Sequence, residues 1–154
     1  MSYKNFDLSM FFQGSQGNDV MNIQLYDTES GTGYYNAPEG FLQKSWSGEG
    51  STDKFHKISQ KQGLNGSVSD YYVEDGSYLR LKNIQFGYNF ANAFLQKMKV
   101  SKLRLYVGAQ NLLTVTGYSG LDPEIGNADP KLTGIDQGYY PQARTFMIGI
   151  NAKF

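Results

Sequence analysis

The sequence predicts an all-β protein built on an antiparallel sheet of about four long strands. Two observations support this prediction. Apolar and polar residues alternate over four separate segments, with the period of two that marks a strand with unlike faces. Tyrosine and phenylalanine, which favour strands, are abundant, with 12 and 10 copies in 154 residues.

The expected strands cover about residues 3–13, 77–90, 101–115 and 143–154. The last one, ARTFMIGINAKF, alternates up to the final residue of the sequence, although chain ends usually fray unless something holds them. One face of this strand is therefore expected to lie against an apolar environment, and that face carries Phe146, Ile148, Ile150, Ala152 and Phe154.

The alternation of the second segment slips by one residue at Lys82–Asn83. Leu79 and Leu81 share one phase, whereas the apolar residues from Ile84 onward share the other. One extra residue at this point, a β-bulge, would return both groups to one face of the sheet.

The spacers between the strands are long, short and long, at residues 14–76, 91–100 and 117–141. A compact soluble domain rarely carries structureless loops longer than about 15 residues. An outer-membrane β-barrel does, because its external loops are long and its periplasmic turns are short. We therefore expect two external loops, 14–76 and 117–141, and one periplasmic turn, 91–100.

Strand length and charge placement agree with a barrel wall. Eleven residues at about 3.3 Å each, tilted by about 45°, span roughly the 25 Å of the apolar band. A basic residue at the middle of the lipid face costs about 2–4 kcal/mol. Asp7, Lys102, Arg104 and Lys153 all fall on the polar phase. Known barrels of this kind have at least about eight strands, so four strands indicate part of a larger barrel.

Composition argues against several other classes of protein. Fourteen basic residues balance 14 acidic ones, whereas a general nucleic-acid binder shows a basic excess. The absence of cysteine excludes disulfides and thiolate metal sites. The sequence contains no run of about 18 apolar residues, so it predicts no membrane-spanning helix. His56 is the only histidine and has no nucleophile at a recognisable spacing, so we expect no catalytic site, no metal and no cofactor.

Four blocks of the sequence resemble the closing segments of SusC/RagA-type TonB-linked outer-membrane proteins. They cover both ends and most of the middle, whereas residues 27–68 match poorly. In chain order the blocks are YKNFDLSMFFQGSQGNDVMN, VEDGSYLRLKNIQFGYNF, LRLYVGAQNLLTVTGYSGLDPE and YYPQARTFMIGINAKF.

The resemblance implies a 22-stranded barrel with an N-terminal plug in the outer membrane of a Gram-negative cell. This sequence would supply the last four strands, as the closing part of that barrel. The family implies a SusD-like surface lipoprotein as a lid, coupling to TonB through a plug that lies outside this sequence, and import of oligosaccharides or peptides.

The resemblance also gives the terminal strand a role. In this family the barrel-assembly machinery reads an alternating C-terminal strand that ends in an aromatic residue. Phe146, Ile148, Ile150 and Phe154 would then form the assembly signal as well as the surface that meets lipid.

The external loops contain candidate residues for contact with a ligand or a partner. Trp46 and Tyr118 are aromatic, and rings of this kind stack on sugars or fill interfaces. Asp122 and Glu124 lie in GLDPEIGNADP, whose carboxylates could hold calcium, but their spacing fits no EF-hand loop and Asp-Pro is common in turns.

The alternative is a small soluble β-sheet module that binds a ligand through the same loops. Such a module would bury its apolar strand faces against each other. Leu105, Phe86 and Ile150 distinguish the two hypotheses, because a soluble sandwich encloses them and a barrel wall exposes them.

Overall fold

The computed structural model describes residues 1–29, 35–52, 54–58, 67–91, 95, 100–126 and 129–154. The chain divides into two compact units. The sheet unit comprises residues 1–16, 77–116 and 141–154, and the loop unit comprises residues 17–76 and 117–140. Within the described ranges, no helix has the length and apolarity needed to cross a membrane.

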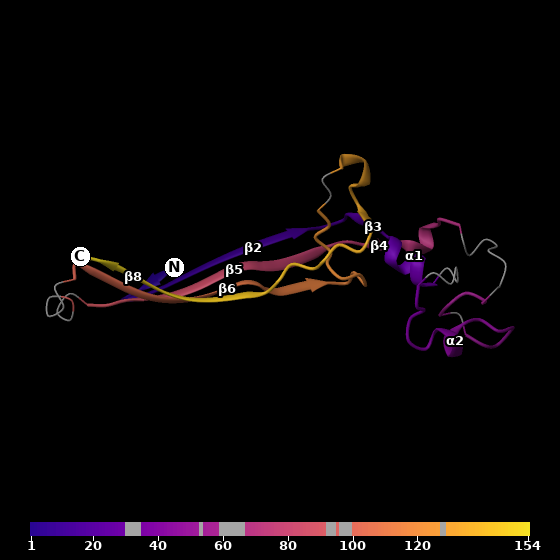
Figure 1. Ribbon diagram of the computed structural model, residues 1–154, viewed down its shortest axis with the longest axis horizontal. Helices are drawn as coiled ribbons and strands as arrows, with labels where there is room; N and C mark the ends of the chain where they lie inside the picture. The colour runs from indigo at the N-terminus through magenta and orange to yellow at the C-terminus, as the bar shows by residue number, and fades with distance from the viewer. Residues whose placement is uncertain (30–34, 53, 59–66, 92–94, 96–99, 127–128) are drawn as a thin grey trace. The chain divides into compact units, whose positions relative to one another are not determined.

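The sheet unit is one antiparallel sheet in the order β1-β2-β5-β6-β8, and its long strands lie side by side (Figure 1). This confirms the predicted fold class. Residues 92–94 and 96–99 of the expected turn lie outside the described residues. The strands are β1 (Ser2–Tyr3), β2 (Phe6–Ser15), β5 (Tyr78–Asn89), β6 (Lys102–Thr116) and β8 (Thr145–Lys153).

The first expected strand, about residues 3–13, differs from the structure at its start. Lys4 has a left-handed backbone (φ 52°), and the chain turns there between β1 and β2. The Met1 amino group donates to the Leu8 carbonyl at 2.8 Å, and the Leu8 N–H donates to the Met1 carbonyl at 2.9 Å. Tyr3 therefore belongs to a separate short strand, because a turn without glycine or proline left the alternation intact in the sequence.

The β-bulge expected at Lys82–Asn83 is present. Phe11 pairs with Asn83 and Phe12 with Leu81, so the register between β2 and β5 skips Lys82. The pairing of β5 with β6 shifts at the same place. Asn111 on β6 adopts a left-handed backbone (φ 50°), and its side-chain amide donates to the Ala143 carbonyl at 3.0 Å. These irregularities keep one face of the sheet apolar along its length.

The apolar face of the sheet is open. Leu105, Phe86 and Ile150 are 37%, 46% and 68% exposed, so no second layer formed by the described residues covers them. This exposure disfavours the soluble sandwich. The cross-strand register places on this face Phe6, Leu8, Met10, Phe12, Leu79, Leu81, Ile84, Phe86, Tyr88, Leu103, Leu105, Val107, Ala109, Leu113, Val115, Phe146, Ile148, Ile150 and Ala152.

The opposite face is polar, and an ion pair together with a hydrogen bond of the same arginine joins three of its strands. Arg104 on β6 forms a salt bridge with Asp7 on β2, and its Nη2 donates to Gln85 Oε1 on β5 at 3.0 Å. Asn89 Nδ2 donates to the same carboxylate at 2.8 Å. Asp7 and Arg104 thus share the face that the sequence analysis assigned to them.

Glycines make room for large side chains on the polar face. Tyr106 pairs with Gly87 on one side and with Gly149 on the other. A Cβ at Gly149 would meet the Tyr106 ring at 2.4 Å, and a Cβ at Gly87 would meet Arg104 at 2.5 Å. Both positions require a residue without a side chain unless the neighbouring side chain moves.

The loop unit has its own small sheet, in the order β4-β3-β7. Strand β3 pairs antiparallel with β4 and parallel with β7, so residues from both long spacers share one sheet. The elements are β3 (Asp19–Asn22), α1 (Ile23–Glu29), α2 (Phe41–Lys44), η2 (Asp70–Tyr72), β4 (Val73–Asp75), η3 (Pro130–Leu132) and β7 (Ile135–Asp136).

The sequence analysis assigned these spacers to external loops, but α1 has an ordinary start signal. Asn22 precedes the helix, and its Oδ1 accepts a hydrogen bond from the Leu25 N–H at 3.0 Å. An asparagine in this position satisfies a backbone donor that the first turn leaves unpaired. The helix has seven residues, too few for its periodicity to stand out in the sequence.

The two sides of β8 can be tested with lysine at adjacent positions in the full-length protein. Ile148→Lys places a charge on the apolar face, where it costs about 2–4 kcal/mol in lipid. We expect it to reduce the folded, heat-modifiable fraction of the protein at least severalfold.

Met147→Lys is the matched control, because Met147 is the neighbouring apolar residue and lies on the polar face. It should assemble close to the wild-type level. Gly149 is unsuitable as a control, since any side chain there meets Tyr106. Equal defects in the two lysine variants would contradict the assignment of the faces.

Candidate functional site

The terminal strand presents its predicted signal residues at the surface. Phe146, Ile148, Ile150 and Phe154 are all exposed. Strand β8 pairs with β6 along one edge, and among the described residues none pairs with its other edge. An unpaired strand edge is a template for another strand. The geometry is that of a strand available for further pairing, and its role as an assembly signal stays a prediction.

Tyr118 lies inside the loop unit and holds a buried carboxylate. Its hydroxyl donates to Asp136 Oδ2 at 2.7 Å, and Asp136 is 1% exposed. Asp136 Oδ1 accepts from the N–H groups of Gly138 and Tyr139 at 2.8 and 3.2 Å. Burial, together with the hydrogen bond to Asp136, raises the pKa of Tyr118. Tyr118 therefore supports the loop.

Asp122 is also buried, and it shapes a turn. Its Oδ1 accepts from the Glu124 N–H at 2.9 Å, and the intervening Pro123 is buried as well. The turn interpretation of GLDPEIGNADP thus accounts for the carboxylate. Among the residues that the structure describes, no group of three or more His, Cys, Asp or Glu could hold a metal ion. Tyr118 and Asp122 are thus buried within the loop unit, and their assignment to a ligand or partner loop stays a prediction.

A second network joins the two spacers within the loop unit. Glu74 on β4 accepts from Asn22 Nδ2 at 2.9 Å and from the Ser119 hydroxyl at 2.7 Å. The Ser119 N–H donates to the other carboxylate oxygen at 2.9 Å. Residues nearly a hundred positions apart in the sequence therefore meet at one carboxylate, which fixes both spacers in one folded body.

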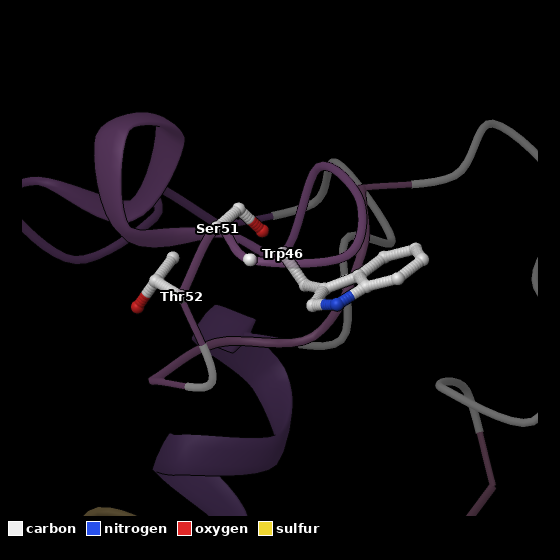
Figure 2. A pocket seen from close by; sticks show the side chains of 4 residues that line it. Trp46, Ser51 and Thr52 are labelled. Atoms are coloured by element: carbon white, nitrogen blue, oxygen red, sulfur yellow. The ribbon is translucent and has the colours of Figure 1, made fainter.

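Trp46, another residue of the predicted ligand or partner loop set, reaches the surface with 42% of its area exposed. It lines an open hollow of about 350 Å³ together with Gly50, Ser51 and Thr52 (Figure 2). The ammonium of Lys57 lies 5.7 Å from the centre of the indole ring. An exposed aromatic ring at the edge of an open hollow can stack on a flat apolar face of a ligand.

Backbone hydrogen bonds hold the Trp46 segment in place. The Trp46 N–H donates to the Phe55 carbonyl at 2.9 Å, and the Phe55 N–H donates to the Lys44 carbonyl at 3.1 Å. Ser51 Oγ donates to the Gly48 carbonyl at 2.6 Å. Phe41 and Phe55 are buried and pack against each other with ring centres 5.2 Å apart. The hollow is therefore built before any ligand arrives.

A buried acid in the loop unit was not identified by the sequence analysis. Glu29 is 4% exposed, and its Oε2 accepts from the Tyr71 hydroxyl at 2.9 Å. Burial raises the pKa of Glu29, and burial and this hydrogen bond raise the pKa of Tyr71 to about 12. Burial lowers the pKa of His56. No motif in the sequence marks these contacts, because their partners are far apart along the chain.

Charge is divided sharply between the two units, although the whole sequence is neutral. Of its 14 acidic residues, 13 belong to the loop unit and only Asp7 belongs to the sheet unit. Of its 14 basic residues, nine belong to the sheet unit and five to the loop unit. The loop unit therefore has a net charge of −8 and the sheet unit a net charge of +8.

An open antiparallel sheet with one continuous apolar face, a polar face and long spacers leaving one end of its strands defines the wall of a transmembrane β-barrel. Comparison with models of known protein families finds no match. Comparison with individual proteins finds matches along the whole chain. The chain is 40% identical over 160 residues to the TonB-dependent receptor P3 of Formosa agariphila. It is 34% identical over 161 residues to the TonB-dependent receptor SusC of Bacteroides thetaiotaomicron.

Comparison with solved structures also finds a protein of this kind. The RagAB peptide importer in its open-open state matches 99% of the chain with a TM-score of 0.82 and 29% identity. The chain belongs to the SusC/RagA family of TonB-dependent receptors, which are β-barrel proteins of the outer membrane. It covers 15% of the P3 receptor, 14% of SusC and 16% of the matched RagAB chain, although each match spans essentially its whole length.

The support that Tyr118 gives to the loop can be measured with Tyr118→Phe in the full-length receptor. The substitution removes one hydrogen bond to a buried carboxylate, a loss of about 1.5–3 kcal/mol. Hydrogen exchange of residues 117–140 should therefore speed up more than tenfold. Tyr140→Phe is the control, because Tyr140 is 90% exposed. Unchanged exchange in Tyr118→Phe would show that this bond does not hold the loop.

The buried acid predicts a dependence on pH. Because the pKa of Glu29 is raised above its ordinary value of 4.5, its stabilising contribution is complete below that pH and is lost as pH rises through the raised pKa. Glu29→Gln should therefore slow proteolysis of the loop unit at pH 7 and leave it unchanged at pH 4.

The pH dependence of stability that His56 contributes has the opposite sign. Because the pKa of His56 is lowered, the protein loses stability as pH falls below 6.5. The wild type and the Glu29→Gln variant both retain His56, so the difference between their proteolysis rates reports the effect of Glu29. The exposed Glu49 provides the control Glu49→Gln, which should match the wild type at both values. A Glu29→Gln variant that is less stable at pH 7 would contradict the prediction.

Proposed function

We propose that this chain forms the closing strands of a TonB-dependent importer that carries oligosaccharides or peptides across the outer membrane. The observation that supports this most directly is the open apolar face of the sheet, which includes Leu105, Phe86 and Ile150. Exposed apolar surface of this extent is stable where lipid covers it and unfavourable where water does. The similarity to TonB-dependent receptors along the whole chain supports the same proposal.

In this proposal the polar face lines the interior of the barrel. The Asp7–Arg104 pair and its partners Gln85 and Asn89 join adjacent strands there. The spacers 14–76 and 117–141 are the external loops, and residues 91–100 form a periplasmic turn. The polarity follows from loop length, since barrels of this type keep their long loops outside.

The proposed partners follow from the family. A SusD-like surface lipoprotein would cover the external loops, and TonB would act through a plug supplied by another part of the receptor. The solved relative is named as the RagAB peptide importer, which supports peptides as one class of cargo. The similarity to SusC supports oligosaccharides as the other. The loop unit would then contact the lid, the cargo or both.

The terminal strand has two proposed roles. Phe146, Ile148, Ile150 and Phe154 would face lipid in the finished barrel, and before closure they would present an alternating strand to the barrel-assembly machinery. The unpaired edge of β8 supports this, because a free edge can add a strand by backbone hydrogen bonding. Backbone pairing in the closed barrel then removes the edge.

The proposal predicts that cells lacking the receptor lose growth on the oligosaccharides or peptides that they otherwise import. Loss of TonB should produce the same defect, and the receptor should fractionate with the outer membrane together with a surface lipoprotein. Growth of the deletion strain on every oligosaccharide and peptide that supports the wild type would contradict the import function. Uptake that persists without TonB would contradict the coupling.

A further inference from the structure

We propose that a groove on the apolar face of the sheet, together with Arg144 at the loop end of β8, binds a phosphorylated glycolipid of the outer leaflet. The groove takes one acyl chain, and the guanidinium takes the phosphate. Lipid lies against this face, because the chain belongs to a family of outer-membrane β-barrels. The choice of leaflet rests on the proposed function, in which the spacers 14–76 and 117–141 are external loops.

The groove lies where a small residue interrupts a row of large ones. Ala109 on β6 pairs with Ile84 on one side and with Phe146 on the other. The other apolar residues of β6 on this face are leucine or valine. The groove has a volume of about 250 Å³, and strands that lie side by side line it (Figure 1). Its lining residues are Ile84, Phe86, Val107, Gly108, Ala109 and Phe146.

Ala109 forms the floor of the groove. It is 6% exposed although it lies on an open face, whereas Phe86, Val107 and Phe146 are 46%, 47% and 71% exposed. The larger side chains therefore stand above Ala109 and form walls. An acyl chain in this groove touches apolar atoms on several sides, and such contacts add up although each one is weak. The groove thus holds a hydrocarbon chain better than a flat part of the same face does.

Arg144 supplies a cation at the loop end of the groove. It lies two residues before Phe146 and takes the same phase, because every second residue of an extended chain lies on one face. Asn111, two residues beyond Ala109 on β6, donates to the Ala143 carbonyl at 3.0 Å. This bond holds the segment before β8 against β6. The exposed Arg144 therefore follows the wall residue Phe146 along the lipid face.

Arg144 has no acidic partner within the described sheet unit. Asp7 is the only acidic residue of that unit, and it pairs with Arg104. A cation on a lipid face is unfavourable unless it reaches the interface or meets an anion. A guanidinium binds a phosphate through two parallel hydrogen bonds, which a lysine cannot do. A lipid phosphate at the level of the headgroups meets this requirement.

The position of Arg144 selects the leaflet. It precedes β8 at the end of the sheet where the spacer 117–141 returns, which is the external end in the proposed orientation. The outer leaflet of a Gram-negative outer membrane consists mainly of phosphorylated glycolipid, and the inner leaflet consists of phospholipid. At the other end of the strands, Lys102 and Lys153 take the polar phase and lie away from lipid. The lipid face therefore offers its arginine to the outer leaflet.

The test uses the full-length receptor, purified from outer membranes in detergent and freed of bound lipid. Native mass spectrometry measures the bound fraction as lipid A, dephosphorylated lipid A or phosphatidylglycerol is added. We expect the wild type to bind lipid A about fivefold or more tightly than either of the other two. Arg144→Gln removes the charge and Ala109→Leu fills the groove, so each should weaken lipid A binding about fivefold or more.

Lys102→Gln and Ala152→Leu are the matched controls. The first removes a cation from the polar face, and the second enlarges an alanine of the apolar face outside the groove. Both should bind lipid A like the wild type, and all four variants should keep the heat-modifiable band of a folded barrel. Arg144→Gln should bind dephosphorylated lipid A as the wild type does, because the partner that it loses is the phosphate.

Wild-type affinity for lipid A in Arg144→Gln would overturn the phosphate contact and leave an arginine that only reaches water. Wild-type affinity in a folded Ala109→Leu variant would overturn the groove. Phosphatidylglycerol bound as tightly as lipid A would overturn the choice of leaflet. Growth of the deletion strain tests import separately, so a receptor that supports growth but binds no lipid A disproves the lipid site alone.

Discussion

The constraint on which the structure depends is that backbone groups inside a bilayer have no water to bond. Each unpaired N–H or C=O in hydrocarbon costs several kcal/mol, so spanning strands must pair along their full length. Strand β5 meets this condition, because it pairs with β2 on one side and with β6 on the other. The outer edge of β8, and that of β2 beyond its short pairing with β1, require strands from elsewhere in the receptor. The sheet is consequently stable as part of a closed barrel.

The same constraint explains why irregular positions in the strands are few and compensated. A bulge that shifted the phase on one strand alone would turn half of its apolar residues toward the interior. Lys82 on β5 and the left-handed Asn111 on β6 lie at the same level, where the register of the pair changes. Asn111 also donates to the Ala143 carbonyl next to the start of β8. Two local departures from regular geometry thus keep both faces uniform across three strands.

The sequence predicted the features that repeat along the chain and missed those that do not. Alternation over nine or more residues located β2, β5, β6 and β8, and a slip in phase located the bulge at Lys82. The turn at Lys4 was missed because neither glycine nor proline marks it. Helix α1 and the β4-β3-β7 sheet were missed because their elements are only two to seven residues long and depend on contacts between distant spacers. For the same reason Trp46 was a candidate from its chemistry alone, whereas the burial of Tyr118 and Asp122 required the fold.

The order of assembly follows from where the loop unit obtains its parts. Met21 pairs with Ile135, and Asn22 bonds through Glu74 to Ser119, so neither spacer can complete its fold alone. Bringing such distant segments together costs chain entropy that grows with the length of the loop between them. Pairing of β5 with β6 removes most of that cost, because it sets Tyr78 opposite Thr116, next to the points where the two spacers begin or end. The loop unit and its Trp46 hollow should therefore form after the strands pair. A receptor that fails to build its wall would then also lack a binding surface.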